Sequence, residues 1–259
     1  MQHFKNEKLY NNKNEKIRQE RWWDDLSIKK KHVIGFMLFC FVGIIATIWL
    51  MLDWKQDVST NLHIKQNIDK IINIKEEKNI NFKKLKQINP DTVGYIKVPN
   101  TNVDYVVVKG TDNDYYLKHD FNKEDNIAGW IFTDYKNKVD GTDKNLVIFG
   151  HDTADGSMFG SLASLLKEEN IENKNNLKID FITEKSKKKY KVFSIYTVEP
   201  EEYYIKTDFK ENEFERFKEK IKERSIYKLD ANIKHKNIIT LSTCQNYGVK
   251  RLAIHAVEI

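Results

Sequence analysis

A cysteine and an arginine lie close together in the stretch TLSTCQNYGVKRLAIH. Cys244 ends an apolar run, and Arg251 begins the next run after six intervening residues. A thiolate can attack an acyl carbon, but it needs a group that exchanges a proton and a donor for the oxyanion that the attack creates. Arginine is always charged and offers a rigid fork of donors, so Arg251 suits the second role and cannot be the base.

Histidine is the expected base, and five of the seven histidines lie beyond the apolar N-terminal segment. His151 directly follows the apolar run NLVIFG and lies among small residues, where an imidazole can reach the end of a neighbouring strand. His255 lies four residues beyond Arg251, roughly 13 Å along a strand, which is too far to share a thiol with it. Surface positions are predicted for His63, His119 and His235.

Cysteine use leaves several roles open for Cys244. The chain has two cysteines, and Cys40 lies in an apolar segment near the N-terminus. If that segment spans a membrane, Cys244 has no disulfide partner in its own compartment, and one cysteine cannot build a zinc site of the usual kind. Cys244 is then a reactive thiol, an inert buried hydrophobe, or half of an intermolecular disulfide.

Residues 33–52 contain no charged side chain and predict a transmembrane helix. Twenty residues at about 1.5 Å each span the hydrocarbon core of a bilayer. Three lysines at 29–31 precede the segment, while Asp53 and Asp57 follow it, so the N-terminus is expected in the cytoplasm and the rest outside the cell. No small-residue cleavage site follows, so the segment is expected to stay as a signal anchor.

The charge of the expected outer part argues against nucleic-acid binding. Residues 1–32 hold nine of the 44 Lys/Arg and five of the 38 Asp/Glu, which leaves the remainder near +2. A nucleic-acid-binding domain usually has a concentrated basic face, and the lysines at 185–191 are interpreted as a solvated turn. The acidic run 112–120 lacks the spacing of a calcium-binding EF-hand loop, so we expect no metal there.

Hydrophobic periodicity predicts the elements that must position Cys244, Arg251 and His151. Isoleucines at helical spacing after residue 62 predict one or two amphipathic helices up to Pro90. Beyond them, short apolar runs with few helices between them predict a closed or nearly closed antiparallel barrel. The eight predicted strands are residues 93–99, 103–110, 129–134, 145–150, 177–183, 190–198, 237–244 and 251–259. Two helices are predicted, at residues 157–169 and 211–224.

These motifs together resemble the sortases, the membrane-anchored cysteine transpeptidases of Gram-positive bacteria. The family's TL-x-TC motif matches residues 240–244, its histidine matches His151, and its arginine matches Arg251 at the head of a last strand. The resemblance covers roughly residues 89–259. Class B sortases in particular are similar in three features: the segment 88–121, a helix-bearing insertion at about 201–229, and the serine of TLSTC.

The resemblance implies a mainly β fold. We expect an eight-stranded sortase-type β-barrel with N-terminal helices and a helix between strands 6 and 7, preceded by a single transmembrane helix. The expected domains are a cytoplasmic tail at 1–32, a signal anchor at 33–52, a helical linker at 53–90 and a catalytic barrel at 91–259.

The resemblance also implies a reaction. Cys244 would attack the threonine carbonyl of a C-terminal sorting signal and form a thioester, His151 would act as general acid and base, and Arg251 would hold the oxyanion. Ser242 and Thr243 would contact the substrate. The acceptor would be a peptidoglycan amine, the signal would be of the NP-x-T-x type or a variant, and no metal or organic cofactor would be needed.

The sequence departs from the family beside the cysteine, and other functions stay open. Gln245 and Asn246 stand where family members often carry an acidic residue, and Asp152 is interpreted as solvent-facing. An L,D-transpeptidase would have a glycine-rich setting around its cysteine, and a papain-like peptidase would have its cysteine early, at a helix start. The open alternatives are a sortase of another class, such as a pilin polymerase, and a non-enzymatic membrane-anchored β module with an inert cysteine.

Overall fold

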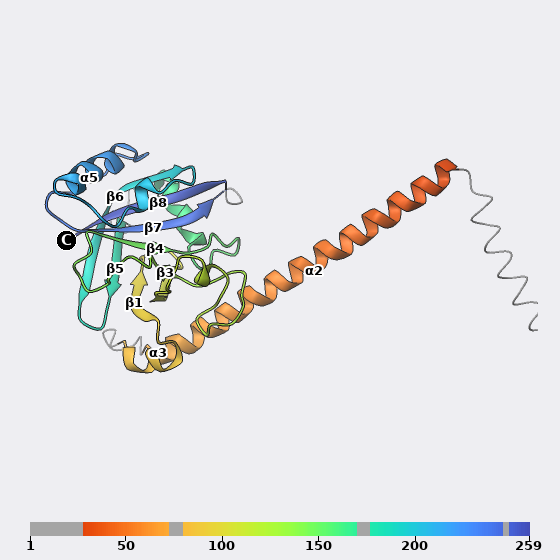
Figure 1. Ribbon diagram of the computed structural model, residues 1–259, viewed down its shortest axis with the longest axis horizontal. Helices are drawn as coiled ribbons and strands as arrows, with labels where there is room; N and C mark the ends of the chain where they lie inside the picture. Colours follow the sequence, from red (N-terminus) through yellow and green to blue (C-terminus); the bar gives the residue numbers. More distant parts are fainter. Residues whose placement is uncertain (1–27, 73–79, 170–176, 246–248) are drawn as a thin grey trace, which may run out of the picture. The chain divides into compact units, whose positions relative to one another are not determined.

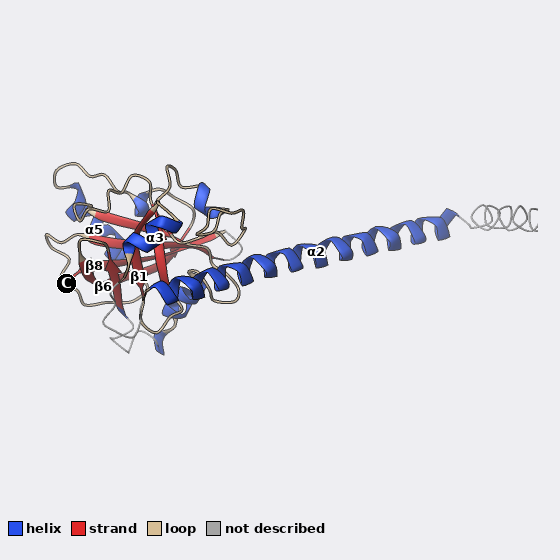
Figure 2. Cartoon of the chain, turned by 90° about the horizontal axis from the view of Figure 1, so that it is seen from below, coloured by secondary structure: helices blue, strands red, loops and turns tan. Residues whose placement is uncertain are grey.

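The structure is a computed structural model that describes residues 28–72, 80–169, 177–245 and 249–259. The side chains of Lys29, Cys244 and Gln245 lie outside this description, as does most of the predicted cytoplasmic tail. The chain divides into two compact units, Met1–Asp53 and Trp54–Ile259. Figure 2 shows the strands of the second unit grouped together, with helices at their periphery.

A long N-terminal helix, α2 (Ile28–Ile71), contains the predicted membrane span. Among the described residues, the helical stretch Lys30–Ile71 is the one long and apolar enough to cross a membrane, and its most apolar window is exposed. The helix is therefore a candidate membrane anchor. Its later turns contribute Ile64 and Ile68 to the core of the second unit, because residues four apart share a helix face. The predicted boundary at residue 53 does not interrupt the helix.

Eight strands close into a barrel, as predicted, in the order β1-β2-β3-β4-β7-β8-β6-β5 (Figure 1). The strands are β1 (Thr92–Lys97), β2 (Asp104–Val108), β3 (Phe132–Thr133), β4 (Asn145–Phe149), β5 (Lys178–Ile182), β6 (Lys187–Val198), β7 (Ile238–Gln245) and β8 (Lys250–Glu258). The expectation of an antiparallel barrel is wrong for two pairings, because β2 pairs with β3 and β4 pairs with β7 in parallel. Parallel pairing requires a long crossover, and the chain between β4 and β7 supplies one.

Strands β7 and β8 separate two hydrophobic clusters because their side chains alternate between faces. Leu241 and Ile254 lie within the barrel core, and both are buried. Ile238 and Ala253 point to the other face and pack in a second cluster with the aromatic side chains of α5 (Glu213–Glu223). Figure 1 shows α5 beside β6. Burying a phenylalanine such as Phe217 stabilises the fold by about 1.5–3 kcal/mol, so α5 is held firmly on this face.

The helices differ from their predictions in length and type. The predicted helix 211–224 is α5, which confirms the amphipathic pattern. The predicted helix 157–169 is instead a 3-10 helix, η2 (Gly160–Leu166), since its serines and glycine are poor α-helix formers. The remaining described short helices are α3 (Phe82–Ile88), η1 (Tyr115–Leu117) and η4 (Tyr203–Ile205).

The predicted strand 129–134 is shorter in the structure: β3 covers Phe132–Thr133, with flanking backbone hydrogen bonds from Val108 N–H to the Ile131 carbonyl and from Asp134 N–H to the Val147 carbonyl. The Trp130 N–H donates instead to the carbonyl of Tyr116 in η1, at 2.9 Å. The chain before β3 therefore binds the loop that carries η1.

Candidate active site

His151 lies two residues beyond the end of β4, where close backbone packing fixes its position. A Cβ atom at Gly150 would lie 2.5 Å from Ile131 Cδ1 and 2.8 Å from Phe159 Cγ, so the site requires a glycine. The Phe159 N–H donates to the His151 carbonyl at 3.0 Å. The half-buried imidazole lies with Nε2 2.8 Å from the carbonyl oxygen of Leu117, the last residue of η1. Both the backbone and the ring of His151 are thus anchored.

The parallel pairing of β4 with β7 brings His151 to the end of β7. Phe149 lies opposite Ser242, and the Gly150 N–H donates to the Ser242 carbonyl at 3.3 Å. Neighbouring strands lie about 4.8 Å apart. Continuing both chains by two residues in the same direction places the backbone of His151 beside that of Cys244.

The antiparallel pairing of β7 with β8 places Arg251 directly opposite Cys244. Opposite positions on paired strands share a sheet face, with Cβ atoms about 5 Å apart. The preceding opposed pair on this face, Ser242 and Ala253, faces the layer that contains η4 and α5. The backbone therefore brings the three predicted catalytic positions together, while the side chain of Cys244 lies outside the described part of the chain.

A pocket of about 420 Å³ lies over these strand ends. Its walls come from η1, the ends of β3 and β4, the insertion between β6 and α5, and the ends of β7 and β8. The lining residues are Asn113, Leu117, Phe132, Phe149, Gly150, His151, Pro200, Glu201, Glu202, Tyr204, Ile205, Ser242, Thr243 and Arg251. Four of the five predicted site residues therefore line one mixed apolar and polar cavity, the composition typical of ligand-binding pockets.

Tyr204 forms part of the pocket wall and was not among the residues predicted from the sequence. Its hydroxyl lies 2.8 Å from Ser242 Oγ, and both residues are buried. The hydrogen bond connects η4 to β7 two residues before Cys244. A tyrosine in a loop gives no periodic signal, and its partner lies 38 residues away, so nothing local in the sequence identifies it.

An ion pair that the sequence did not indicate supports the same wall. Arg224, at the C-terminal end of α5, binds Glu201 of the pocket, and its guanidinium also lies over the rings of Tyr196 and Tyr203. The ion pair raises the pKa of Arg224 above its usual value. It connects the insertion to β6 through Tyr196.

His255 is a structural residue, consistent with its predicted separation from the reacting group. It is fully buried, with Nδ1 2.8 Å from Thr240 Oγ1 and Nε2 3.0 Å from the Tyr196 hydroxyl. Burial lowers its pKa to about 3, with a further lowering from Arg224. His63 and His235 are exposed, as predicted.

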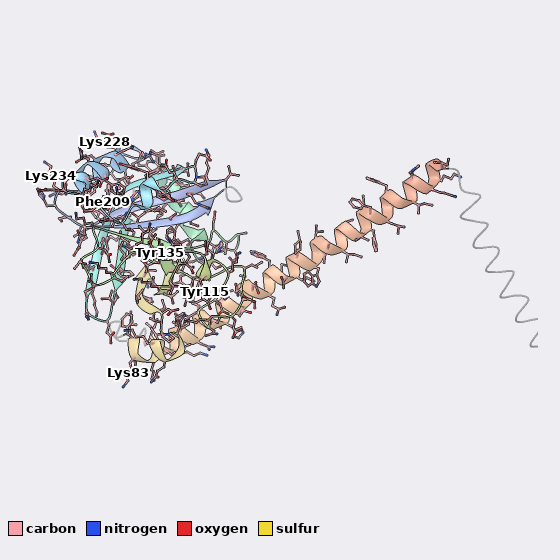
Figure 3. All side chains as sticks on the ribbon, in the orientation of Figure 1. Lys83, Tyr115, Tyr135, Phe209, Lys228 and Lys234 are labelled. Atoms are coloured by element: carbon pink, nitrogen blue, oxygen red, sulfur yellow. The ribbon has the colours of Figure 1, made fainter. Side chains whose placement is uncertain are left out.

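His119, predicted to lie on the surface, belongs to an ordered turn that also contains the acidic residues around it. His119 is half-buried, because its ring stacks on Tyr115 at 3.9 Å between centroids (Figure 3 labels Tyr115). Asp112 accepts hydrogen bonds from the backbone N–H groups of Asp114 and Tyr115, which lowers its pKa. Asp112 therefore caps the turn that leads into η1, while Asp120 accepts from the backbone N–H groups of Asn122 and Glu124 in the next turn. Asp152 is exposed, as predicted.

Comparisons with known proteins identify relatives of this architecture. The family model described as Sortase domain matches residues 96–259. Sortase B of Listeria monocytogenes is 35% identical over 189 residues, which cover 70% of this chain and 75% of the relative.

Two solved structures agree with that match. A sortase B from Bacillus anthracis has a TM-score of 0.71 and 37% identity, covering 79% of this chain and 98% of the relative. A Staphylococcus aureus sortase B, solved as a substrate complex, has a TM-score of 0.70 and 30% identity, covering 80% and 98%. The family model therefore spans the chain from β1 to the C-terminus, and both structural matches cover about four fifths of the chain.

Proposed function

The chain belongs to the sortase family of cysteine transpeptidases, in class B, and we propose that it joins proteins carrying a C-terminal sorting signal to a peptidoglycan amine through Cys244. The observation that supports these roles most directly is the double pairing of β7. Its end lies beside the end of β4, which leads to His151, and opposite Arg251 of β8.

The proposed reaction begins with the Cys244 thiolate and a protonated His151. The sulfur attacks the carbonyl carbon of a threonine in the signal, and the carbon–nitrogen bond breaks as His151 gives its proton to the departing amine. The product is a thioester. An incoming amine then attacks the thioester carbon, its proton passes to His151, and the carbon–sulfur bond breaks to regenerate the thiolate.

Arg251 is the proposed donor to the oxyanion that forms in each addition step. It lines the pocket opposite Cys244, and a guanidinium in a partly dehydrated site stabilises negative charge more strongly than water does. Ser242 and Thr243 line the pocket, so they are proposed to contact the peptide. Tyr204 orders the Ser242 hydroxyl for that contact.

The proposed substrates are secreted proteins with an NP-x-T-x-like signal. The proposed topology follows the charge around residues 33–52: a cytoplasmic tail at 1–32, a signal anchor at 33–52, a linker at 53–90 and an extracellular catalytic barrel at 91–259. The exposed apolar face of α2 suits a single-pass anchor.

Quenched peptides containing four- or five-residue threonine signals test the reaction. The full chain in detergent is incubated with the peptides, with and without an oligoglycine or diaminopimelate amine. The masses of the peptide products and of the intact protein are then measured by mass spectrometry. We expect an acyl adduct on Cys244, cleavage after threonine and a new amide when amine is present.

Two variants test the roles of Cys244 and His151. Cys244→Ala should abolish turnover with a nearly unchanged melting temperature, and His151→Ala should lower both cleavage and transfer. Turnover by Cys244→Ala would refute the mechanism. A folded wild type that forms no adduct and whose Cys244 resists alkylation would favour the non-enzymatic β module.

A further inference from the structure

The carbonyl of Leu117 determines which nitrogen of His151 carries a proton. A carbonyl oxygen accepts hydrogen bonds and cannot donate them, so Nε2 of His151, 2.8 Å away, must be the donor. In the neutral ring the lone pair is then on Nδ1. Since Nε2–H stays on the carbonyl, Nδ1 is the atom that exchanges protons with the reacting groups.

The Leu117 carbonyl is held in place from several sides. The Leu117 N–H donates to the Asp114 carbonyl at 3.1 Å, and the Trp130 N–H donates to the adjacent Tyr116 carbonyl at 2.9 Å. A Cβ atom at Gly129 would lie 2.9 Å from the Leu117 oxygen and 2.5 Å from the Tyr116 oxygen. The backbone at 129, with φ of +56°, therefore packs directly against both carbonyls.

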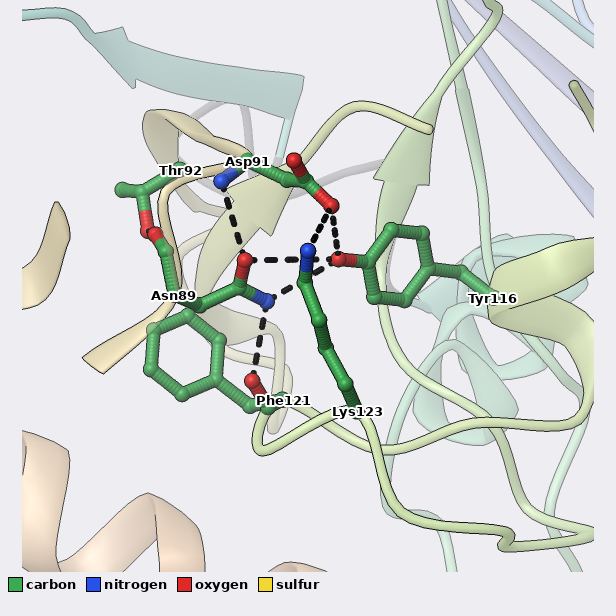
Figure 4. Close-up of polar contacts among 6 residues, drawn as sticks. All are labelled: Asn89, Asp91, Thr92, Tyr116, Phe121 and Lys123. Carbon is green, nitrogen blue, oxygen red and sulfur yellow. Dashed lines mark hydrogen bonds and ion pairs between the residues drawn. The ribbon is translucent and has the colours of Figure 1, made fainter. Parts of the chain in front are cut away.

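The side chain of Tyr116 anchors this backbone to the start of β1. It is fully buried, and its hydroxyl donates to Asp91 Oδ2 at 2.6 Å and accepts from Asn89 Nδ2 at 3.0 Å (Figure 4). Lys123 pairs with the same Asp91 oxygen at 2.7 Å. Desolvation and the contact with Asp91 raise the pKa of Tyr116 far above its usual range, so the hydroxyl keeps its proton and remains a donor.

We infer that Tyr116 and Asp91 are positioning residues that hold the Leu117 carbonyl against His151 Nε2 and thereby make Nδ1 the atom that transfers the proton in each step. The inference about transfer rests on the proposed function, whereas the tautomer does not. In acylation Nδ1–H goes to the departing amine, and in transfer the proton of the incoming amine goes to Nδ1. Nε2–H stays on the Leu117 carbonyl throughout.

Nuclear magnetic resonance of the histidine ring nitrogens tests the tautomer without any substrate. The full chain, labelled with ¹⁵N-histidine in detergent, is titrated with pH, and His151→Gln identifies the His151 signals. We expect neutral His151 to carry its proton on Nε2. A wild-type ring with its proton on Nδ1 would overturn the inference.

Variants test whether the hydroxyl network holds that tautomer. Tyr116→Phe removes the hydroxyl, and we expect a mixture of tautomers together with a kcat about tenfold lower, a fraction of the 10²–10⁴-fold contribution typical of a general acid and base. KM should change less than about twofold, because the peptide pocket is untouched. Tyr227→Phe is the matched control, since it removes a tyrosine hydroxyl that donates to the Leu166 carbonyl at 2.7 Å, and it should leave the tautomer and kcat unchanged.

If Tyr116→Phe fails to fold, two substitutions at Asp91 test whether the Tyr116–Asp91 hydrogen bond holds the His151 tautomer. Asp91→Ala and Asp91→Asn both remove the charge that pairs with Lys123, but Asn keeps an oxygen that accepts from Tyr116. We expect Asp91→Ala to behave like Tyr116→Phe and Asp91→Asn to retain the wild-type tautomer. Equal tautomer populations in Asp91→Ala and wild type would overturn the positioning role. If neutral His151 carries its proton on Nε2 but the chain has no transpeptidase activity, the proposed function would be refuted. The assignment of the His151 tautomer would still hold.

Discussion

Acidification should destabilise the barrel through His255. Both nitrogens of the neutral ring have hydrogen-bond partners. Thr240 Oγ1 donates to Asn145 Oδ1 at 2.7 Å, so it accepts from His255 Nδ1–H, and Nε2 accepts from the Tyr196 hydroxyl. Burial lowers the pKa of His255 from 6.5 to about 3. Because the folded-state pKa lies below the unfolded-state value, the stabilisation is complete above pH 6.5 and is lost as the pH falls from 6.5 towards 3.

The magnitude follows from the two pKa values. Each pH unit between them is worth about 1.4 kcal/mol, so complete titration costs about 5 kcal/mol. At about pH 5, His255 is protonated in the unfolded state but remains neutral in the folded state. This difference lowers the unfolding free energy by roughly 2 kcal/mol. That is a large fraction of the 5–15 kcal/mol typical of a domain.

Urea unfolding of the full chain in detergent, followed by near-ultraviolet circular dichroism, measures this loss. His255→Gln keeps an amide near the Tyr196 hydroxyl but removes the titrating group, and the carboxylates of the two proteins titrate alike. Between about pH 7.5 and pH 5, the wild type should lose about 2 kcal/mol more of its unfolding free energy than the variant. Equal losses would show that His255 does not titrate as its burial requires.

Other substitutions around the pocket have separate signatures. Arg251→Lys should lower kcat about 10²–10³-fold with little change in melting temperature, because an ammonium cannot reproduce the guanidinium fork; kcat within threefold of wild type would exclude an oxyanion role. Tyr204→Phe should raise KM severalfold while kcat stays near wild type, since it removes the 2.8 Å contact that orders Ser242, and an unchanged KM with the best peptide would contradict this. Gly150→Ala should lower the unfolding free energy by about 1–3 kcal/mol in denaturant titrations, because a Cβ there meets Phe159 at 2.8 Å; an equally stable protein would mean that the His151 turn has room to adjust.

Local signals in the sequence predict the strands well, because each strand carries its own alternation or apolar run. All eight predicted strands overlap strands of the barrel, and the family resemblance identified the three positions that lie together at the end of β7. The helix predicted at 157–169 is represented by a shorter 3-10 helix, since its two serines and its glycine disfavour an α-helix despite the apolar spacing of its leucines.

Long-range partners are the part that the sequence could not predict. Tyr204 meets Ser242, Arg224 meets Glu201, and Tyr116 meets Asp91, each from a different loop or element. These contacts depend on how loops of irregular conformation fold over the barrel. No period in the sequence records such a conformation.

The direction of one strand pairing decides whether the site can exist. If β4 and β7 paired antiparallel, the end of β4 would lie beside the start of β7. His151 would then be separated from Cys244 by most of the length of β7, about 20 Å for a strand of this length. The parallel pairing instead brings the carboxyl ends of β4 and β7 together, and the antiparallel pairing of β8 returns Arg251 to the same end. The crossover that makes β4 and β7 parallel also carries η4 and α5, so one stretch of chain both aligns the proposed catalytic residues and builds a wall of the pocket above them.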